Sequence, residues 1–168
     1  MMFVRLAILL LTNRVFSHPT HHDGFDPVVY ESMGVVPPFQ SYHVHVMYIQ
    51  DGADSKARAM RLRDGFISDL SPIENCTDLF NETDLCMYEV VERDGGIFIS
   101  GDWAAFIPIE RYHAVVAYTM QHRGDLDVLF HPNTNNYVHD HFRWSTWGGR
   151  QWPLNVEAFT QYGQVAGE

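Results

Sequence analysis

The stretch that decides the fold is YHVHVMYI, residues 42–49. Its residues are mostly β-branched or aromatic, and their alternation predicts a β-strand. Because successive side chains of a strand point to opposite faces, His43, His45 and Met47 share one face. Four apolar or aromatic side chains share the other face: Tyr42, Val44, Val46 and Tyr48. The strand therefore offers one face to a core and two histidines to the other side of the sheet.

A helix and a β-rich region follow this strand. Apolar residues recur at helical spacing at positions 59, 62, 66 and 70, which predicts an amphipathic helix from about Ala53 to Leu70. Residues 87–91 and 96–99 are β-prone and flank the turn dipeptide Asp94-Gly95, so we expect two further strands or one bent hairpin there.

A second helix and a last strand complete the pattern. Pro108 fits the first position of a helix, Gly124 can end it, and residues 126–131 form a strong strand. The predicted apolar stripe of this helix consists of Ile109, Tyr112, Val116 and Met120. The order of elements predicts an α+β fold, a ferredoxin-like sandwich in which an antiparallel sheet carries two helices on one face.

This topology brings histidines together. The last strand of such a sandwich lies beside the first and antiparallel to it, so His131 is expected to approach His43 and His45. The segment containing His139, Asp140 and His141 leaves from the same edge. Imidazole is a common ligand for zinc, copper and iron, and a nonhaem Fe(II) oxygenase site needs three protein ligands plus open positions. From spacing alone, an exposed sheet face or a hydrogen-bonded pair of core histidines remains an alternative.

Several features favour an exported protein. Arg5 precedes an apolar run and a cleavage-like Val15-Phe16-Ser17, which predicts a signal peptide; a buried N-terminal strand or helix is the alternative. The two cysteines, Cys76 and Cys86, are expected to pair in an oxidising compartment. Asn75 and Asn81 begin glycosylation sequons in the same loop. We therefore expect four segments: a signal peptide at 1–17, an extended arm at 18–40, one domain at 41–154 and a tail at 155–168.

Composition narrows the function classes. The chain has 168 residues and a formal net charge of -10, with scattered acids, so nucleic acid is an unexpected partner. No apolar run after the leader reaches the roughly 20 residues that cross a bilayer, which predicts no membrane insertion. Exposed edge strands are compatible with a homodimer.

The motifs resemble those of the DOPA 4,5-dioxygenase family. The resemblance covers most of the chain from Tyr42 to about Leu154 and is carried by these segments: Tyr42–Val46, Leu62-Arg63, Arg123–His131, Pro132-Asn133-Thr134, Asp140-His141 and Trp147–Gly149. It implies a ferredoxin-like fold and extradiol cleavage of a catechol ring, such as that of DOPA, by O₂ at a histidine-bound metal. That metal is expected to be Fe(II), with zinc as the alternative. By position, His43, His45, His131 and His141 match the histidines of the family and are the candidate site residues. Our hypothesis is that His43, His45 and His131 are metal ligands and that His141 is a fourth ligand or the acid–base residue.

Three features depart from the family pattern. The histidine of a Pro-His-Pro segment before the Met-Tyr strand is absent, and Thr83 or its neighbours occupy that stretch. A later histidine is replaced by Trp144, and Glu92–Ala105 looks like an insertion. The chain is then either a dioxygenase with an altered site, in which His139 is a candidate substitute, or a noncatalytic secreted pseudoenzyme that binds a metal or a phenolic ligand.

Overall fold

The computed structural model describes residues 39–73, 75–78, 82–92, 96–134 and 136–161. Its elements, in chain order, are β1 (Ser41–Tyr48), α2 (Ala53–Leu70), β2 (Cys86–Met87), β3 (Gly101–Pro108), the 3₁₀ turn η1 (Ile109–Arg111), α3 (Tyr112–His122), β4 (Val128–Pro132), α4 (Tyr137–Phe142), β5 (Thr146–Gly148) and α5 (Val156–Gln161). No helix among these residues is long and apolar enough to span a membrane.

The sheet confirms the predicted topology. Its strand order is β2-β3-β1-β4-β5, and every neighbouring pair is antiparallel. The first four strands in this order, with α2 and α3 as their connections, make the ferredoxin-like sandwich. As expected, β4 lies beside β1, and the additional strand β5 extends the sheet at that edge.

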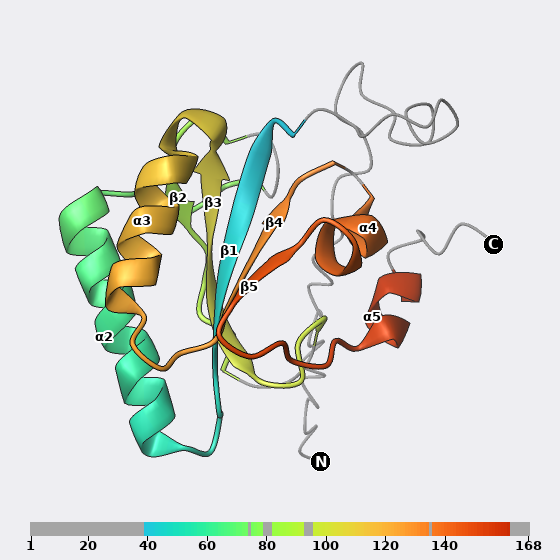
Figure 1. Cartoon of the computed structure of the whole chain (residues 1–168), viewed down its shortest axis with the longest axis horizontal. Helices are drawn as coiled ribbons and strands as arrows, with labels where there is room; N and C mark the ends of the chain where they lie inside the picture. The colour runs from blue at the N-terminus through green and yellow to red at the C-terminus, as the bar shows by residue number, and fades with distance from the viewer. Residues whose placement is uncertain (1–38, 74, 79–81, 93–95, 135, 162–168) are drawn as a thin grey trace, which may run out of the picture.

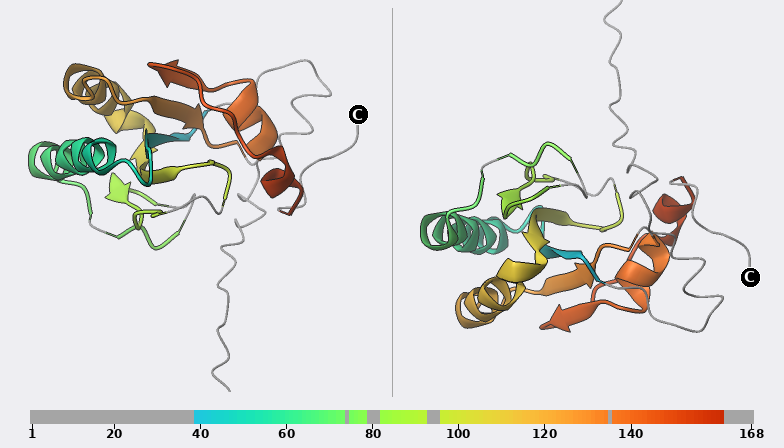
Figure 2. Two further views of the ribbon diagram at one scale, coloured as in Figure 1. Left: turned by 90° about the horizontal axis from the view of Figure 1, so that it is seen from below. Right: turned by 90° about the horizontal axis from the view of Figure 1, so that it is seen from above.

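The sheet separates a helix layer from the side that carries the histidines. Figure 1 shows α2 and α3 together on one face of the sheet, and α4 and α5 on its other side; Figure 2 shows the same two layers from below and above. Val44, Val46 and Tyr48 are fully buried toward the helices, where they pack with Phe66 and Trp103. Burial of each such side chain stabilises the folded state by about 1.5–3 kcal/mol. The alternation predicted for β1 is therefore correct.

Helix α2 has the predicted bounds, but the description of the second helix was partly wrong. Pro108 ends β3, and the 3₁₀ turn η1 comes before α3. Because a 3₁₀ turn has fewer residues per turn than an α-helix, it changes the rotational phase of the following residues. Ile109 and Met120 face solvent, whereas Tyr112 and Val116 pack against the core as predicted, together with the buried Val115 and Thr119.

The middle of the chain differs most from expectation. In place of the strands predicted at 87–91 and 96–99, β2 covers only two residues, and β3 (Gly101–Pro108) is a central strand that was not predicted. All eight residues of β3 are buried, so its sequence lacks the polar alternation that marks a half-exposed strand. Residues 101–105, at the end of the apparent insertion, thus form part of the sheet. The turn dipeptide Asp94-Gly95 lies outside the described residues.

The predicted disulfide between Cys76 and Cys86 is present. Asn75 is exposed beside it, whereas Asn81, the expected signal peptide and nearly all of the expected arm lie outside the described residues. The expected tail from residue 155 contains helix α5, whose Phe159 is fully buried against Tyr137.

Candidate metal centre

The two histidines of β1 and the histidine of β4 meet on the sheet face opposite α2 and α3. The strand register places His43 directly across from His131, and His45 two residues further along β1. His43 is 3 % exposed and His131 is 2 % exposed. One ring nitrogen from each of these three residues lies within 4.8 Å of the other two. The convergence predicted from the topology is therefore confirmed.

Each ring of the pair His45 and His131 is oriented by a partner of its Nδ1 atom. His45 Nδ1 donates to the carboxylate of Asp102 across 3.0 Å, and His131 Nδ1 donates to the carbonyl oxygen of Pro132 across 2.8 Å. Carbonyl and carboxylate oxygens only accept, so these contacts place a proton on Nδ1 and leave Nε2 with its lone pair in the neutral ring. Hydrogen bonds of this kind orient metal-binding histidines in proteins.

The two Nε2 atoms so defined lie 3.2 Å apart. Two lone pairs at this distance repel unless a proton or a cation lies between them. Two imidazole nitrogens that bind one ion at about 2.0–2.1 Å are roughly 2.8–3.4 Å apart, for ligand angles between octahedral and tetrahedral. The observed spacing falls within that interval, so His45 and His131 fit a shared metal ion.

Tyr88 contacts the third histidine of this cluster. Its hydroxyl lies 3.1 Å from His43 Nε2. Burial raises the pKa of Tyr88 well above its usual value, and the carboxylates of Glu82 and Asp78 raise it further. The phenol therefore stays protonated and can donate to His43.

Helix α4 adds His141 to the cluster. Asn136 caps the helix by accepting from the His139 backbone N–H, and His141 Nδ1 donates to the Tyr137 carbonyl across 2.8 Å. The His141 ring lies against His131, with ring centroids 3.9 Å apart. His139 packs edge-on against Trp144 and does not belong to the group of histidines that could hold a metal among the described residues.

Asp140 fastens α4 to the segment after β4. Its carboxylate accepts from the Thr134 backbone N–H across 3.0 Å and from the Thr134 hydroxyl across 2.6 Å. Burial raises the pKa of Asp140 to about 8, although both hydrogen bonds act in the opposite direction. Asp140 thereby holds the helix that presents His141.

A cavity of about 540 Å³ reaches the histidines. His43, His45 and His141 line it, and its apolar lining includes Met87, Val90, Ile97 and Phe98. Cavities of 300–1,000 Å³ are typical of sites for small organic ligands. A small aromatic molecule could thus contact three of the four candidate histidines.

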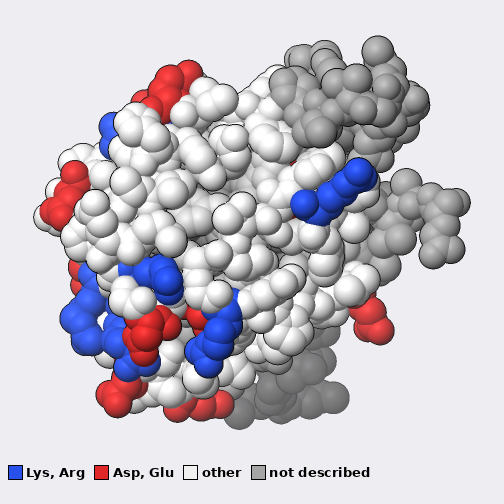
Figure 3. Space-filling view, in the orientation of Figure 1, with Lys and Arg blue, Asp and Glu red and all other residues white. Residues whose placement is uncertain are grey.

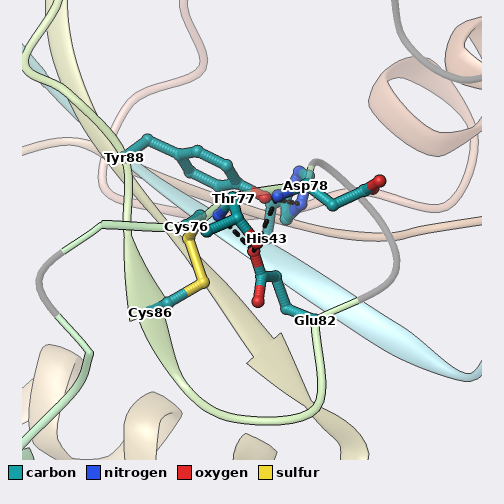
Figure 4. The surroundings of a disulfide bond; sticks show 7 residues. All are labelled: His43, Cys76, Thr77, Asp78, Glu82, Cys86 and Tyr88. Atoms are coloured by element: carbon teal, nitrogen blue, oxygen red, sulfur yellow. Dashed lines mark hydrogen bonds between the residues drawn. A yellow bond between two sulfur atoms is a disulfide. The ribbon is translucent and has the colours of Figure 1, made fainter.

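The disulfide supports one wall of this cavity. Asn75 and Cys76 belong to its lining, and Figure 4 shows Tyr88 and His43 close to the Cys76–Cys86 bond. Glu82 holds the same loop: its carboxylate accepts from the hydroxyl and backbone N–H of Thr77 and, across 2.7 Å, from the backbone N–H of Asp78. The disulfide and these hydrogen bonds thus hold the described part of the loop in place beside the histidines.

Neither Asp102 nor Tyr88 was predicted from the sequence. In the register of β1 and β3, Met47 faces Asp102 and His45 faces Ala104, so Asp102 shares the histidine face. One signal was available, because an aspartate that opens an apolar run is unusual in a buried strand unless it has a partner. That signal could be used only once residues 101–108 were recognised as a strand.

Comparison with known proteins shows the family of the chain. The sequence model of the Dopa 4,5-dioxygenase family matches residues 42–158. The chain belongs to this family. The matched segment begins in β1, ends in α5 and contains all four candidate histidines.

Two relatives illustrate the likeness. A DOPA 4,5-dioxygenase from Amanita muscaria is 26% identical over 155 residues, which are 92% of this chain and 65% of the relative. The chain thus spans about 65% of the length of that curated relative. A crystal structure from Nostoc punctiforme, of a protein with a provisional dioxygenase assignment, superposes with a TM-score of 0.60 and 26% identity over 73% of this chain and 93% of that one.

Proposed function

We propose that the protein is an Fe(II)-dependent extradiol dioxygenase that opens a catechol ring with O₂. The observation that carries the proposal is the 3.2 Å approach of His45 Nε2 and His131 Nε2, whose Nδ1 atoms both donate to oxygen acceptors. His45 also lines the cavity of about 540 Å³. Imidazole ligands suit iron and also zinc, and a reaction with O₂ favours iron because zinc is not redox-active.

The residues divide into ligands and positioning groups. His45, His131 and His43 would hold the metal, and Asp102 would fix the ring of His45. When bound, Fe(II) would supply the Lewis acidity that lowers the pKa of the catechol hydroxyls and the redox partner for O₂. For His43 Nε2 to bind the metal, the Tyr88 hydroxyl would have to give up its contact with that atom.

His141 is the proposed acid–base residue, with a role as fourth ligand as the alternative. It lines the cavity, and its Nδ1 is held by the Tyr137 carbonyl, so Nε2 is the atom that would accept the catechol proton. In the overall reaction one ring C–C bond beside the diol breaks and both atoms of O₂ enter the product. The ring itself supplies the electrons, so no external reductant is required.

The test is anaerobic reconstitution of the full protein with Fe(II), followed by measurement of O₂ uptake and absorbance on addition of a catechol such as DOPA. We expect stoichiometric uptake with a coloured ring-opened product, and its loss in His131→Ala. His113→Ala is the matched control, because His113 is exposed on α3, on the helix face of the sheet. Wild-type protein that binds iron and catechol without uptake would refute the activity.

One observation favours a noncatalytic binding protein as the second candidate. The Tyr88 hydroxyl lies 3.1 Å from His43 Nε2, where it competes with a metal for that lone pair. If the contact persists after metal addition, the ion keeps fewer protein ligands. Metal or catechol binding without ring opening, in both wild type and Tyr88→Phe, would support this alternative.

We also propose that the protein is exported and glycosylated. A disulfide between Cys76 and Cys86 is typical of oxidising compartments, and Asn75 is exposed beside it. Recovery of the protein from culture medium, with a mass that falls after enzymatic removal of N-glycans, would support export. A fully reduced, unglycosylated protein retained in cells would contradict it.

A further inference from the structure

The walls of the cavity carry charge of one sign. Among its described lining residues the charged side chains are Glu89 and Asp102, and this described lining contains no lysine or arginine. Glu89 is exposed, whereas Asp102 is buried against His45. Glu89 is therefore the acidic residue of this lining that solvent reaches.

Other acids extend this negative region. Glu82 and Asp78 act on the Tyr88 hydroxyl, which itself lines the cavity. On the opposite side of the sheet, four basic residues belong to α2, namely Lys56, Arg58, Arg61 and Arg63. Figure 3 shows basic side chains gathered in the part of that view where α2 lies. None of these four residues belongs to the described lining of the cavity, although Lys56 pairs with Glu92, the neighbour of the lining residue Val91.

The chemistry of the ring substituent follows from this charge distribution. A catechol carboxylate would bring its anion toward Glu89 with no basic side chain of the described lining to pair with it, which costs binding energy. An ammonium group is attracted to the same place, and the apolar side chains of Met87, Val90 and Phe98 suit a short hydrocarbon linker. The net charge of -10 adds long-range attraction for cations.

We infer that the site selects catechols that bear a cationic amine and no carboxylate, a class represented by dopamine, with Glu89 as the specificity-determining residue. This inference rests on the proposed function, since it assumes that the catechol ring is directed to the histidines. It departs from the amino-acid substrate in the family's name, because DOPA also carries a carboxylate.

The test uses the full, Fe(II)-loaded protein and four catechols of different charge: dopamine, 4-methylcatechol, DOPA and 3,4-dihydroxyphenylacetate. The expected order of kcat/KM is dopamine first, then 4-methylcatechol, then DOPA, with 3,4-dihydroxyphenylacetate last. Glu89→Gln reduces the ratio of dopamine to 3,4-dihydroxyphenylacetate by about fivefold, the order of effect expected when one solvent-screened charge is removed from the lining. The matched control is Glu110→Gln, an exposed glutamate of η1, which leaves the ratio unchanged.

Each outcome decides between the inference and the proposed function. Equal or faster turnover of DOPA or 3,4-dihydroxyphenylacetate than of dopamine overturns the inference and leaves the dioxygenase intact. If no catechol is opened, the dioxygenase proposal fails, and calorimetric Kd values for the same four compounds still test the order. If none of the four binds, or if Glu89→Gln leaves the order of affinities and the ratio unchanged, the inference is wrong.

Discussion

The hydrogen bond from His45 to Asp102 predicts a measurable dependence of metal affinity on a residue that does not touch the metal. Its length is 3.0 Å, and the Asp102 side chain is 7 % exposed, so solvent screens the contact only weakly. Loss of such a partner typically weakens metal binding by about 10–100-fold, or about 1.4–2.7 kcal/mol. Asp102→Ala should reach the upper part of that range. Asp102→Asn keeps an acceptor oxygen and should lie near the lower part.

The assay is competitive titration of the apoprotein with Zn(II) or Fe(II) against a chromophoric chelator under anaerobic conditions. Asp125→Asn is the matched control, because the Asp125 side chain is 74 % exposed in an ion pair with Arg58. Circular dichroism before titration shows whether each variant is folded. If folded Asp102→Ala binds metal as tightly as wild type, Asp102 does not orient a ligand and the reasoning about the His45 tautomer is refuted.

Three further predictions concern stability. The double variant Cys76→Ser/Cys86→Ser should lose about 2–3 kcal/mol in urea unfolding, since the bond closes a short loop at a sequence separation of 10; an unchanged midpoint would contradict this. Phe66→Ala should cost about 3–5 kcal/mol by the same measurement, because Phe66 is fully buried against Trp103, and a loss below 1 kcal/mol would exclude the described packing. Hydrogen bonds from Arg150 and Trp152 hold the pKa of Asp127 below its usual value despite burial. The stabilisation from Asp127 is therefore present above the unfolded pKa of about 3.9 and is lost as pH falls through the lower folded pKa. Asp127→Asn should make the free energy of unfolding less dependent on pH in this acid range, and an unchanged dependence would show that the contacts contribute nothing.

The elements with strong periodic patterns could be predicted from the sequence. The alternation in β1 and the helical spacing in α2 each reflect one buried face. In these elements the spacing of apolar residues in the sequence therefore shows directly which side chains pack in the core. The placement of His131 beside His43 followed from topology, because the last strand of this sandwich pairs with the first strand and runs antiparallel to it.

The parts that could not be predicted depend on contacts distant in sequence. Strand β3 is buried along its whole length, so it shows no alternation, and its partners are fixed only by the completed sheet. Asp102 and Tyr88 become recognisable as site residues only through their distances to His45 and His43. The start of α3 was also missed, because the 3₁₀ turn η1 takes up the first residues of the predicted helix, and residue spacing does not reveal such a turn.

The central claim is that the histidines of β1 and β4 bind one metal ion. Its most direct test is a crystal structure of the metal-loaded protein with anomalous scattering recorded at the absorption edge of the metal. The account predicts one strong anomalous peak between His45 Nε2 and His131 Nε2, at about 2.0–2.2 Å from each nitrogen. A metal-loaded crystal with no peak there, or with its metal bound only by residues outside this cluster, would contradict the account.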